Sequence, residues 1–196
     1  STNPIAVGDC VKLSLEAGDY LITEILERKN YIIRKSVNLS KQVHIIASNM
    51  DQAFLIVTLV SPATSTGFID RFLITAEAYQ IPTLIVFNKI DLYDEFDREY
   101  HDELVNMYSK AGYECVGISA LNNQNISLLK DRMRGKVTLV SGHSGVGKST
   151  FINVISPNLG IPTNQVSASH QKGMHTTTFA EMFELDFGGF IIDTPG

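Results

Sequence analysis

The stretch G-H-S-G-V-G-K-S occupies positions 142–149, between a short apolar run at residues 137–140 and a segment with apolar residues at helical spacing. It fits the pattern G-x-x-x-x-G-K-[ST] of a loop that binds nucleotide phosphates. Glycines let successive backbone N–H groups point toward one anion, and the N-terminus of the following helix adds positive charge. The stretch, called the phosphate loop below, therefore predicts a strand–loop–helix unit that binds a nucleotide.

The loop assigns roles to individual residues. Lys148 is expected to reach the β- and γ-phosphates and to stabilise charge during catalysis, and Ser149 is expected to bind Mg²⁺. The residues predicted to contact the nucleotide here are Gly142, His143, Ser144, Gly145, Val146, Gly147, Lys148, Ser149 and Thr150.

A second candidate, Asp-Thr-Pro-Gly at residues 193–196, follows an apolar run near the end of the chain. In phosphate-loop enzymes an aspartate at such a place holds Mg²⁺, usually through water, and the glycine N–H meets the γ-phosphate. We therefore predict Asp193 as a metal ligand and Gly196 as a nucleotide contact. Taken alone, the same pattern would indicate only a turn at the end of a strand.

A third pattern, Asn88-Lys89-Ile90-Asp91, follows the apolar run at residues 84–87. The carboxylate of Asp91 can accept hydrogen bonds from both N1–H and N2–H₂ of guanine, whereas adenine would leave it buried without a partner. Asn88 is expected to tie loops together, and the stem of Lys89 can lie over the base. The pattern predicts guanine as the base, although such residues are also common in surface turns.

The rest of the chain predicts the architecture. Apolar runs such as residues 53–57 and 84–87 lack polar alternation, which is typical of strands buried on both faces of a parallel sheet. Segments with apolar residues every three or four positions separate them, which predicts covering helices and an α/β fold. Residues 1–45 instead alternate apolar and polar side chains, which predicts about three strands of a partial β-barrel.

The composition excludes several classes of protein. The 196 residues include 16 basic and 21 acidic ones, for a net charge of −5, and 44% are hydrophobic. These values exclude a disordered tail and argue against nucleic-acid binding by overall charge alone. The stretch from Leu26 to Ile45 nevertheless carries five basic residues against the single acid Glu27; it is either a solvated β face or a local basic patch, and the five are Arg28, Lys29, Arg34, Lys35 and Lys41.

Cys10 and Cys115 have no metal-ligand spacing, so we predict reduced thiols in a cytoplasmic protein. The longest apolar run, residues 53–60, is too short to span a bilayer, so no membrane association is predicted. The chain begins with Ser1 and stops directly after Asp-Thr-Pro-Gly, so we expect it to be a piece of a longer protein.

The order of the motifs is unusual. In ordinary phosphate-loop GTPases the Asn-Lys-x-Asp motif and a following Ser-Ala pair come after the phosphate loop, but here residues 88–91 and Ser119-Ala120 precede it. Ser119 and Ala120 are expected to let backbone N–H groups approach the base. The sequence therefore resembles a circularly permuted GTPase, whose site can survive because the natural termini of such domains are often close.

The sequence is similar in particular to the RsgA (YjeQ) family. The residues that carry this likeness are Val7-Gly8-Asp9, Asn49-Met50-Asp51-Gln52, Phe68-Ile69-Asp70-Arg71-Phe72-Leu73, the phosphate loop with Thr150, and Lys172-Gly173-Met174-His175-Thr176-Thr177-Thr178. The resemblance implies that residues 1–45 are part of an RNA-binding OB-fold, that residues 46–196 are a permuted GTPase domain, and that a Zn²⁺-binding domain follows in the parent protein.

The resemblance also implies an activity. It implies a monomeric, cytoplasmic enzyme that binds GTP, GDP and Mg²⁺, hydrolyses GTP on the small ribosomal subunit late in its assembly, binds rRNA, and leaves after hydrolysis. Two alternatives stay open, namely a nucleotide-gated RNA-binding module with negligible turnover and a permuted GTPase of large-subunit assembly.

Two further catalytic residues are expected near the end of the chain. Thr177 is predicted to be the switch threonine that closes on Mg²⁺, with Thr176 and Thr178 as alternatives, and His175 is predicted to position the attacking water. The simpler interpretations are a threonine run with β propensity and a solvated loop histidine.

Overall fold

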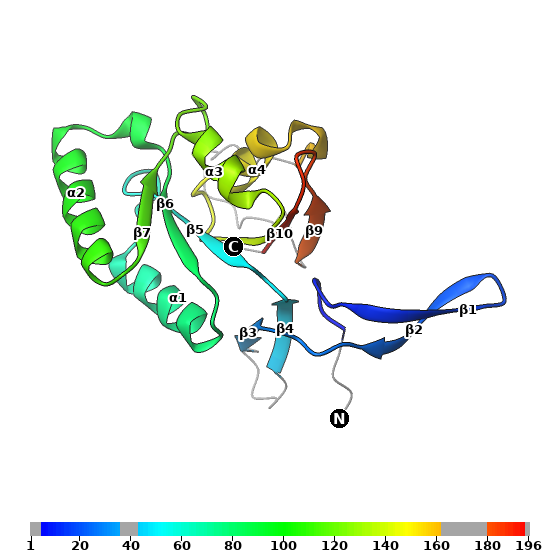
Figure 1. Ribbon diagram of the computed structural model, residues 1–196. Helices are drawn as coiled ribbons and strands as arrows, with labels where there is room; N and C mark the ends of the chain where they lie inside the picture. The colour runs from blue at the N-terminus through cyan, green and yellow to red at the C-terminus, as the bar shows by residue number, and fades with distance from the viewer. Residues whose placement is uncertain (1–4, 36–42, 162–179, 195–196) are drawn as a thin grey trace, which may run out of the picture.

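The computed structural model describes residues 5–35, 43–161 and 180–194 (Figure 1). Two short 3-10 turns span Ile90–Leu92 and Pro157–Leu159. The strands and helices of the described residues are β1 (Val11–Glu16), β2 (Asp19–Ile25), β3 (Tyr31–Lys35), β4 (Val43–Ser48), β5 (Gln52–Val57), α1 (Thr66–Ala78), β6 (Thr83–Phe87), α2 (Glu95–Lys110), β7 (Glu114–Gly117), α3 (Ile126–Met133), β8 (Val137–Ser141), α4 (Lys148–Ile155), β9 (Glu181–Glu184) and β10 (Phe190–Asp193).

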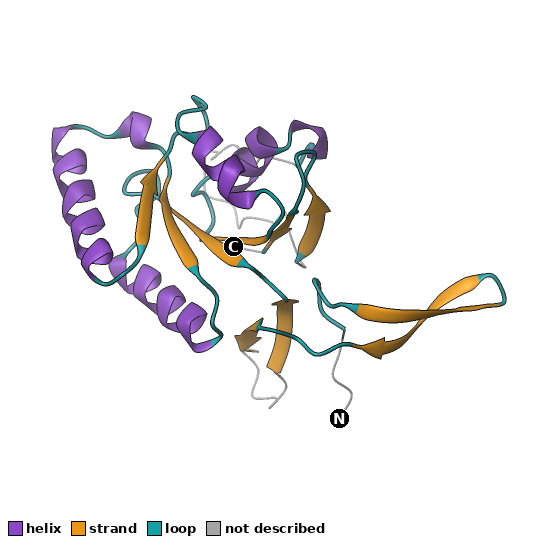
Figure 2. Ribbon diagram, viewed as in Figure 1, coloured by secondary structure: helices purple, strands orange, loops and turns teal. Residues whose placement is uncertain are grey.

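A six-stranded sheet forms the centre of the molecule, in the order β7-β6-β5-β8-β10-β9. Every neighbouring pair is parallel except β10 and β9, which are antiparallel. Helices separate the parallel strands along the chain, as each parallel crossover requires (Figure 2). The α/β fold with a mostly parallel sheet, predicted from the apolar runs, is confirmed.

The two faces of the sheet are covered by different helices (Figure 1). In β5, Phe54 and Ile56 face the cluster that contains α3 and α4, whereas Leu55 and Val57 face the cluster that contains α1 and α2. Successive side chains in a strand point to opposite faces of the sheet. A strand covered on both faces is therefore apolar at nearly every position. Each of these four side chains is fully buried, which stabilises the fold by about 1.5–3 kcal/mol per residue.

Capping side chains mark the starts of helices α1 and α2, and a glycine follows the end of α2. The Ser65 side chain accepts from the Phe68 N–H at the start of α1, and Asp94 and Asp97 form a reciprocal capping box at the start of α2. These side chains satisfy N–H groups that have no partner within the helix. After α2, Gly112 takes a φ of +94°, the left-handed conformation with which helices often end.

The described residues before Asn49 form two antiparallel pairs, β1–β2 and β3–β4. The strand β4 is additional to the three expected, and the division expected between residues 45 and 46 falls within it; that division and the OB-fold interpretation stay predictions. The reason that β4 escaped the sequence pattern is its bulge. Ile32 pairs with Ala47 and Ile33 with Ile45, so Ile46 is an extra residue that breaks the alternation.

The β1–β2 hairpin extends away from the sheet (Figure 1). Its apolar side chains are unusually exposed, with Leu15 at 65% and Tyr20 at 72%. The β3–β4 pair is packed differently, since Ile32 and Ala47 share a buried cluster with residues of the central sheet. The N-terminal part is therefore anchored to the sheet through β3 and β4.

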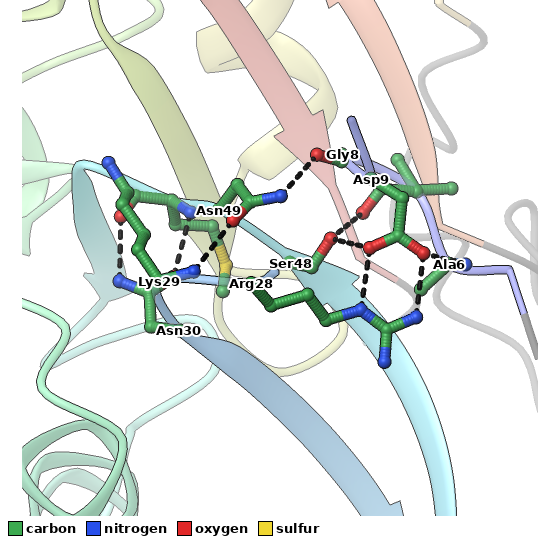
Figure 3. A network of polar contacts seen from close by, with 10 residues as sticks. Ala6, Gly8, Asp9, Arg28, Lys29, Asn30, Ser48 and Asn49 are labelled. Atoms are coloured by element: carbon green, nitrogen blue, oxygen red, sulfur yellow. Dashed lines mark hydrogen bonds and ion pairs between the residues drawn. The ribbon is translucent and has the colours of Figure 1, made fainter. Parts of the chain in front are cut away.

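A polar network around Asp9, formed with Ala6, Arg28 and Ser48 and called the Asp9 joint below, stabilises this N-terminal part (Figure 3). The Asp9 carboxylate accepts two hydrogen bonds of 2.6 Å from the Arg28 guanidinium, one of 2.6 Å from the Ser48 hydroxyl and one of 2.8 Å from the Ala6 N–H. The Asp9 and Arg28 side chains are only 1% and 8% exposed. Burial by itself would raise the pKa of the Asp9 carboxyl, but the hydrogen bonds from Arg28, Ser48 and Ala6 lower it to about 2.

Neighbouring residues extend the joint to the central sheet. Asn30 exchanges two hydrogen bonds of 2.8 Å with the backbone of Met50, and Asp51 accepts from the Val137 N–H at the start of β8 and from Lys29. The basic stretch is thus partly used inside the molecule. Arg28 is buried against Asp9, so its charge is used within the fold; RNA binding by the rest of the stretch stays a prediction, and Lys41 lies outside the described residues.

Within the described ranges, no helix combines the length and apolar character needed to cross a membrane.

Candidate nucleotide-binding site

Five loops meet at one edge of the central sheet. They follow β5, β6, β7, β8 and β10, whose mutually parallel arrangement brings their carboxyl ends together. Ligands of open α/β sheets bind outside this edge. Four of the five loops hold residues that the sequence singled out, so the fold collects motifs that are up to about 100 positions apart in the chain.

The phosphate loop connects β8 to α4 as predicted, and its backbone carbonyls are unusually well occupied. Each carbonyl from residue 142 to residue 146 accepts a hydrogen bond from a side chain. The pairs, donor first, are Lys148 to Gly142 (2.5 Å), Lys148 to His143 (3.2 Å), His143 to Ser144 (3.0 Å), Lys89 to Gly145 (2.8 Å) and Asn88 to Val146 (2.8 Å). A loop whose carbonyls are held on one side can present its N–H groups on the other, as an anion-binding nest requires.

The close approach of two loops explains the last glycine of the motif. Gly147 has a φ of +94°, a conformation that side chains rarely adopt. A Cβ atom at this position would lie 2.4 Å from the Asn88 amide nitrogen. Only glycine therefore allows Asn88 to reach the phosphate loop.

Asn88 joins three loops through its amide group. Its nitrogen donates to the Val146 carbonyl, and its oxygen accepts from the Ala120 N–H at 3.0 Å. Asn88, Ser119 and Ala120 are all buried. The structure thus places the Asn-Lys-x-Asp motif, the Ser-Ala pair and the phosphate loop around one amide group.

The base-reading candidate Asp91 lies in the turn Ile90–Leu92 and is exposed. The turn is held by the Ile90 N–H, which donates to the Ile118 carbonyl just before Ser119. Its neighbour Lys89 has a φ of +65° and donates to the carbonyls of Ser61 and Gly145.

The electrostatics favour an anion at this edge. Burial lowers the pKa of the Lys148 ammonium, and the nearby charge of Asp193 offsets part of that effect. Burial likewise lowers the pKa of Lys89, and Asp91 counteracts it. A partly buried cation held mainly by backbone carbonyls would be stabilised by a bound phosphate.

Asp193 ends β10 next to the phosphate loop and is 4% exposed. Its neighbour Thr194 donates to the Val140 carbonyl at the end of β8 (3.1 Å). Ser149 and Thr150 lie in the first turn of α4. Among the described residues no group of three or more His, Cys, Asp and Glu gathers as a metal site.

The remaining candidates, His175, Thr176, Thr177, Thr178 and Gly196, lie outside the described residues. In the other direction, the structure adds residues that the sequence did not indicate. The loop after β5 brings Thr64 against His143 of the phosphate loop, and its Ser61 carbonyl accepts from Lys89, which also donates to Gly145. A Ser-Pro pair at residues 61–62 was the only local sign that this loop has a fixed shape.

Comparisons with known proteins place these observations in one family. A family model described as RsgA GTPase matches residues 25–196. The protein named small ribosomal subunit biogenesis GTPase RsgA from Bacteroides fragilis is 56% identical over 197 residues, and the one from Phocaeicola vulgatus is 58% identical. Each match covers all of this chain and 64% of the relative, so the chain spans somewhat less than two thirds of these proteins.

Solved structures agree with the fold. YjeQ from Thermotoga maritima matches with a TM-score of 0.76 and 37% identity, over 99% of this chain and 62% of that one. YloQ, described as a circularly permuted GTPase, matches with a TM-score of 0.67 and 29% identity, over 100% of this chain and 58% of that one.

Proposed function

The chain belongs to the RsgA GTPase family, and from this premise we propose that it binds GTP and GDP at the carboxyl edge of its sheet and hydrolyses GTP during assembly of the small ribosomal subunit. The names of its relatives support a role in assembly of the small ribosomal subunit. The order of the motifs supports a circularly permuted GTPase. A protein with this task would act in the cytoplasm.

The main support for the proposal is the arrangement of the phosphate loop. Its carbonyls accept hydrogen bonds from the side chains of Lys148, Lys89, Asn88 and His143. A loop of this kind offers N–H groups and a lysine to phosphates, and α4 adds the positive end of its dipole. The Lys148 ammonium donates to the carbonyls of Gly142 and His143, and it would exchange them for phosphate oxygens when a nucleotide binds.

Recognition of guanine is assigned to the turn after β6. The Asp91 carboxylate accepts from N1–H and N2–H₂ of the base, and the Asn88 side chain of the same motif accepts from the Ala120 N–H in the next loop. Because Asn88 links this region to the phosphate loop, the base and the phosphates are held at a fixed separation.

The residues present fit a magnesium ion. Ser149 offers a hydroxyl in the first turn of α4, and Asp193 offers a buried carboxylate at the end of β10, and hard cations prefer such oxygen ligands. These two residues, with Thr177, would hold Mg²⁺, which supplies neutralisation of phosphate charge.

Hydrolysis requires the oxygen of a water molecule to bond to the γ-phosphorus while the bond from that phosphorus to the GDP oxygen breaks. Lys148 and the loop N–H groups stabilise the charge on the phosphoryl oxygens, and catalysis consists of positioning and charge stabilisation. His175 is assigned to hold the water. Release from rRNA after hydrolysis follows if the bound γ-phosphate keeps the switch threonine closed.

Nucleotide identity is tested by Asp91→Asn. The amide offers a donor to the 2-oxo group of xanthine, so we expect affinity to move from GTP toward XTP. Asp131→Asn on α3, whose side chain is 76% exposed, is the control and should keep the preference for GTP. An unchanged preference in Asp91→Asn would contradict the assignment.

The activity is tested by GTP hydrolysis of the full-length protein with and without purified small subunits. Stimulation by small subunits is the expected result. Turnover that stays at background with subunits present would favour the nucleotide-gated RNA-binding module, and selective binding to large subunits would favour the other alternative.

A further inference from the structure

The loop between β5 and α1, residues 58–65 and called the support loop below, lies against the outer side of the phosphate loop. The Thr64 hydroxyl is 2.7 Å from Nε2 of His143. The Lys89 ammonium bridges the same two loops, because it donates to the carbonyls of both Ser61 and Gly145.

The support loop has an internal hydrogen-bond network of its own. The Thr58 N–H donates to the Thr64 hydroxyl (3.0 Å), the Thr64 N–H donates to the Thr58 carbonyl (2.7 Å), and the Thr58 hydroxyl donates to the Pro62 carbonyl (2.5 Å). Thr58 is fully buried and Thr64 is 8% exposed. These bonds fix the position from which Thr64 reaches His143.

The hydrogen bonds around His143 have one consistent direction. The Ser144 carbonyl can only accept, so Nδ1 of the ring carries a hydrogen and donates to it at 3.0 Å. When the ring is neutral, Nε2 accepts, and its donor is the Thr64 hydroxyl, which itself accepts from the Thr58 N–H. The chain of bonds runs from Thr58 through Thr64 and His143 to Ser144.

Packing supports the same contact. The Phe68 ring meets the His143 ring edge to face, with 5.4 Å between the centroids and an interplanar angle of 87°. A Cβ atom at Gly145 would lie 3.1 Å from Pro62 Cδ, so the two loops already touch. Polar and apolar contacts thus hold residues 143–145 in a single arrangement.

We propose that Thr64 and His143 are positioning residues that hold the phosphate loop in its nucleotide-binding shape before the nucleotide arrives. The inference rests on the proposed function, because it concerns the affinity of that site. Without this contact, part of the binding free energy would be spent on ordering the loop, so affinity would fall. Thr64 does not act on the phosphate itself, so turnover at saturating GTP should change little.

The test compares Thr64→Val with Thr64→Ser. Valine keeps the size of threonine but leaves the Thr58 N–H and His143 Nε2 without their partner, whereas serine keeps the hydroxyl. We expect the Kd for Mg²⁺·GDP and the KM for GTP to rise about tenfold in Thr64→Val, with kcat within about twofold. Thr64→Ser should restore the Kd to within about twofold of the wild type.

Thr75→Val on α1 is the matched control. Among the described residues its hydroxyl bonds only to the Arg71 carbonyl of its own helix, so the Kd for Mg²⁺·GDP should stay at the wild-type value. His143→Phe, which keeps the ring against Phe68, is the second variant. It should weaken GDP binding as Thr64→Val does, and Thr64→Val should add little in its background.

A spectroscopic measurement needs no variant. The ¹⁵N shifts of the His143 imidazole in the nucleotide-free protein should show a protonated Nδ1 and an accepting Nε2. The opposite tautomer, or Thr64→Val that binds GDP as tightly as the wild type, would overturn this inference alone. A wild-type protein that binds no guanine nucleotide would overturn the proposed function and this inference together.

Discussion

At the Asp9 joint a buried guanidinium meets a buried carboxylate through two hydrogen bonds of 2.6 Å, whereas at the phosphate loop the Lys148 ammonium rests on two backbone carbonyls. The joint contains both members of its ion pair, so its contribution is to the folded state. The Lys148 side chain is partly buried without such close pairing among the described residues, and burial lowers its pKa. The Asp9–Arg28 pair thus stabilises the folded state, whereas the Lys148 charge is available to bind a ligand.

The largest effect on stability is expected at the Asp9 joint. Asp9→Asn keeps the size of the side chain but leaves the Arg28 charge buried without its carboxylate. Removing one member of a buried pair destabilises a protein by about 3–5 kcal/mol. The free energy of unfolding, measured by urea denaturation, should fall by this amount, and a loss below about 1 kcal/mol would show that the joint does not anchor the N-terminal part.

Lys148→Met should behave in the opposite way. Loss of the ammonium should weaken binding of Mg²⁺·GDP by about 100-fold or more, because charge-assisted bonds to phosphate disappear. The free energy of unfolding should stay within about 1 kcal/mol of the wild type or rise, since a desolvated cation no longer has to be buried. A large loss of stability would instead assign Lys148 a structural role.

The stabilisation by Asp9 should depend on pH. The pKa of the Asp9 carboxyl is about 2 in the folded protein against an ordinary value of 3.8, so the unfolded chain binds the proton more readily. The stabilisation is fully present above about pH 4 and is lost as the pH falls toward 2, by about 2 kcal/mol in all. Denaturation between pH 5 and 2 should therefore show this loss in the wild type and not in Asp9→Asn.

The smallest effect is expected at an exposed ion pair. Lys12 and Glu24 lie 2.6 Å apart on the β1–β2 hairpin, but their side chains are 62% and 53% exposed. Glu24→Gln should change the free energy of unfolding by less than about 1 kcal/mol. An effect as large as that of Asp9→Asn would mean that burial does not decide what these pairs contribute.

The sequence predicted what local patterns can encode. The phosphate loop, the buried strands β5, β6 and β8 and the helix that starts at Lys148 were all expected from short motifs and periodicity. The Asp9 joint and the contact of Thr64 with His143 were not, because they join residues 19 to 79 positions apart, and no spacing rule encodes such a pair. Likewise β4 escaped because its bulge breaks the alternation on which strand prediction depends.

Thermal unfolding with and without Mg²⁺·GDP tests the central claim most directly. A ligand raises the unfolding temperature only of a protein that binds it in the folded state. Saturating Mg²⁺·GDP should raise the unfolding temperature of the wild type and of Asp9→Asn, and at the same concentration it should leave that of Lys148→Met nearly unchanged. An equal rise in Lys148→Met would contradict the assignment of the phosphate loop as the nucleotide site.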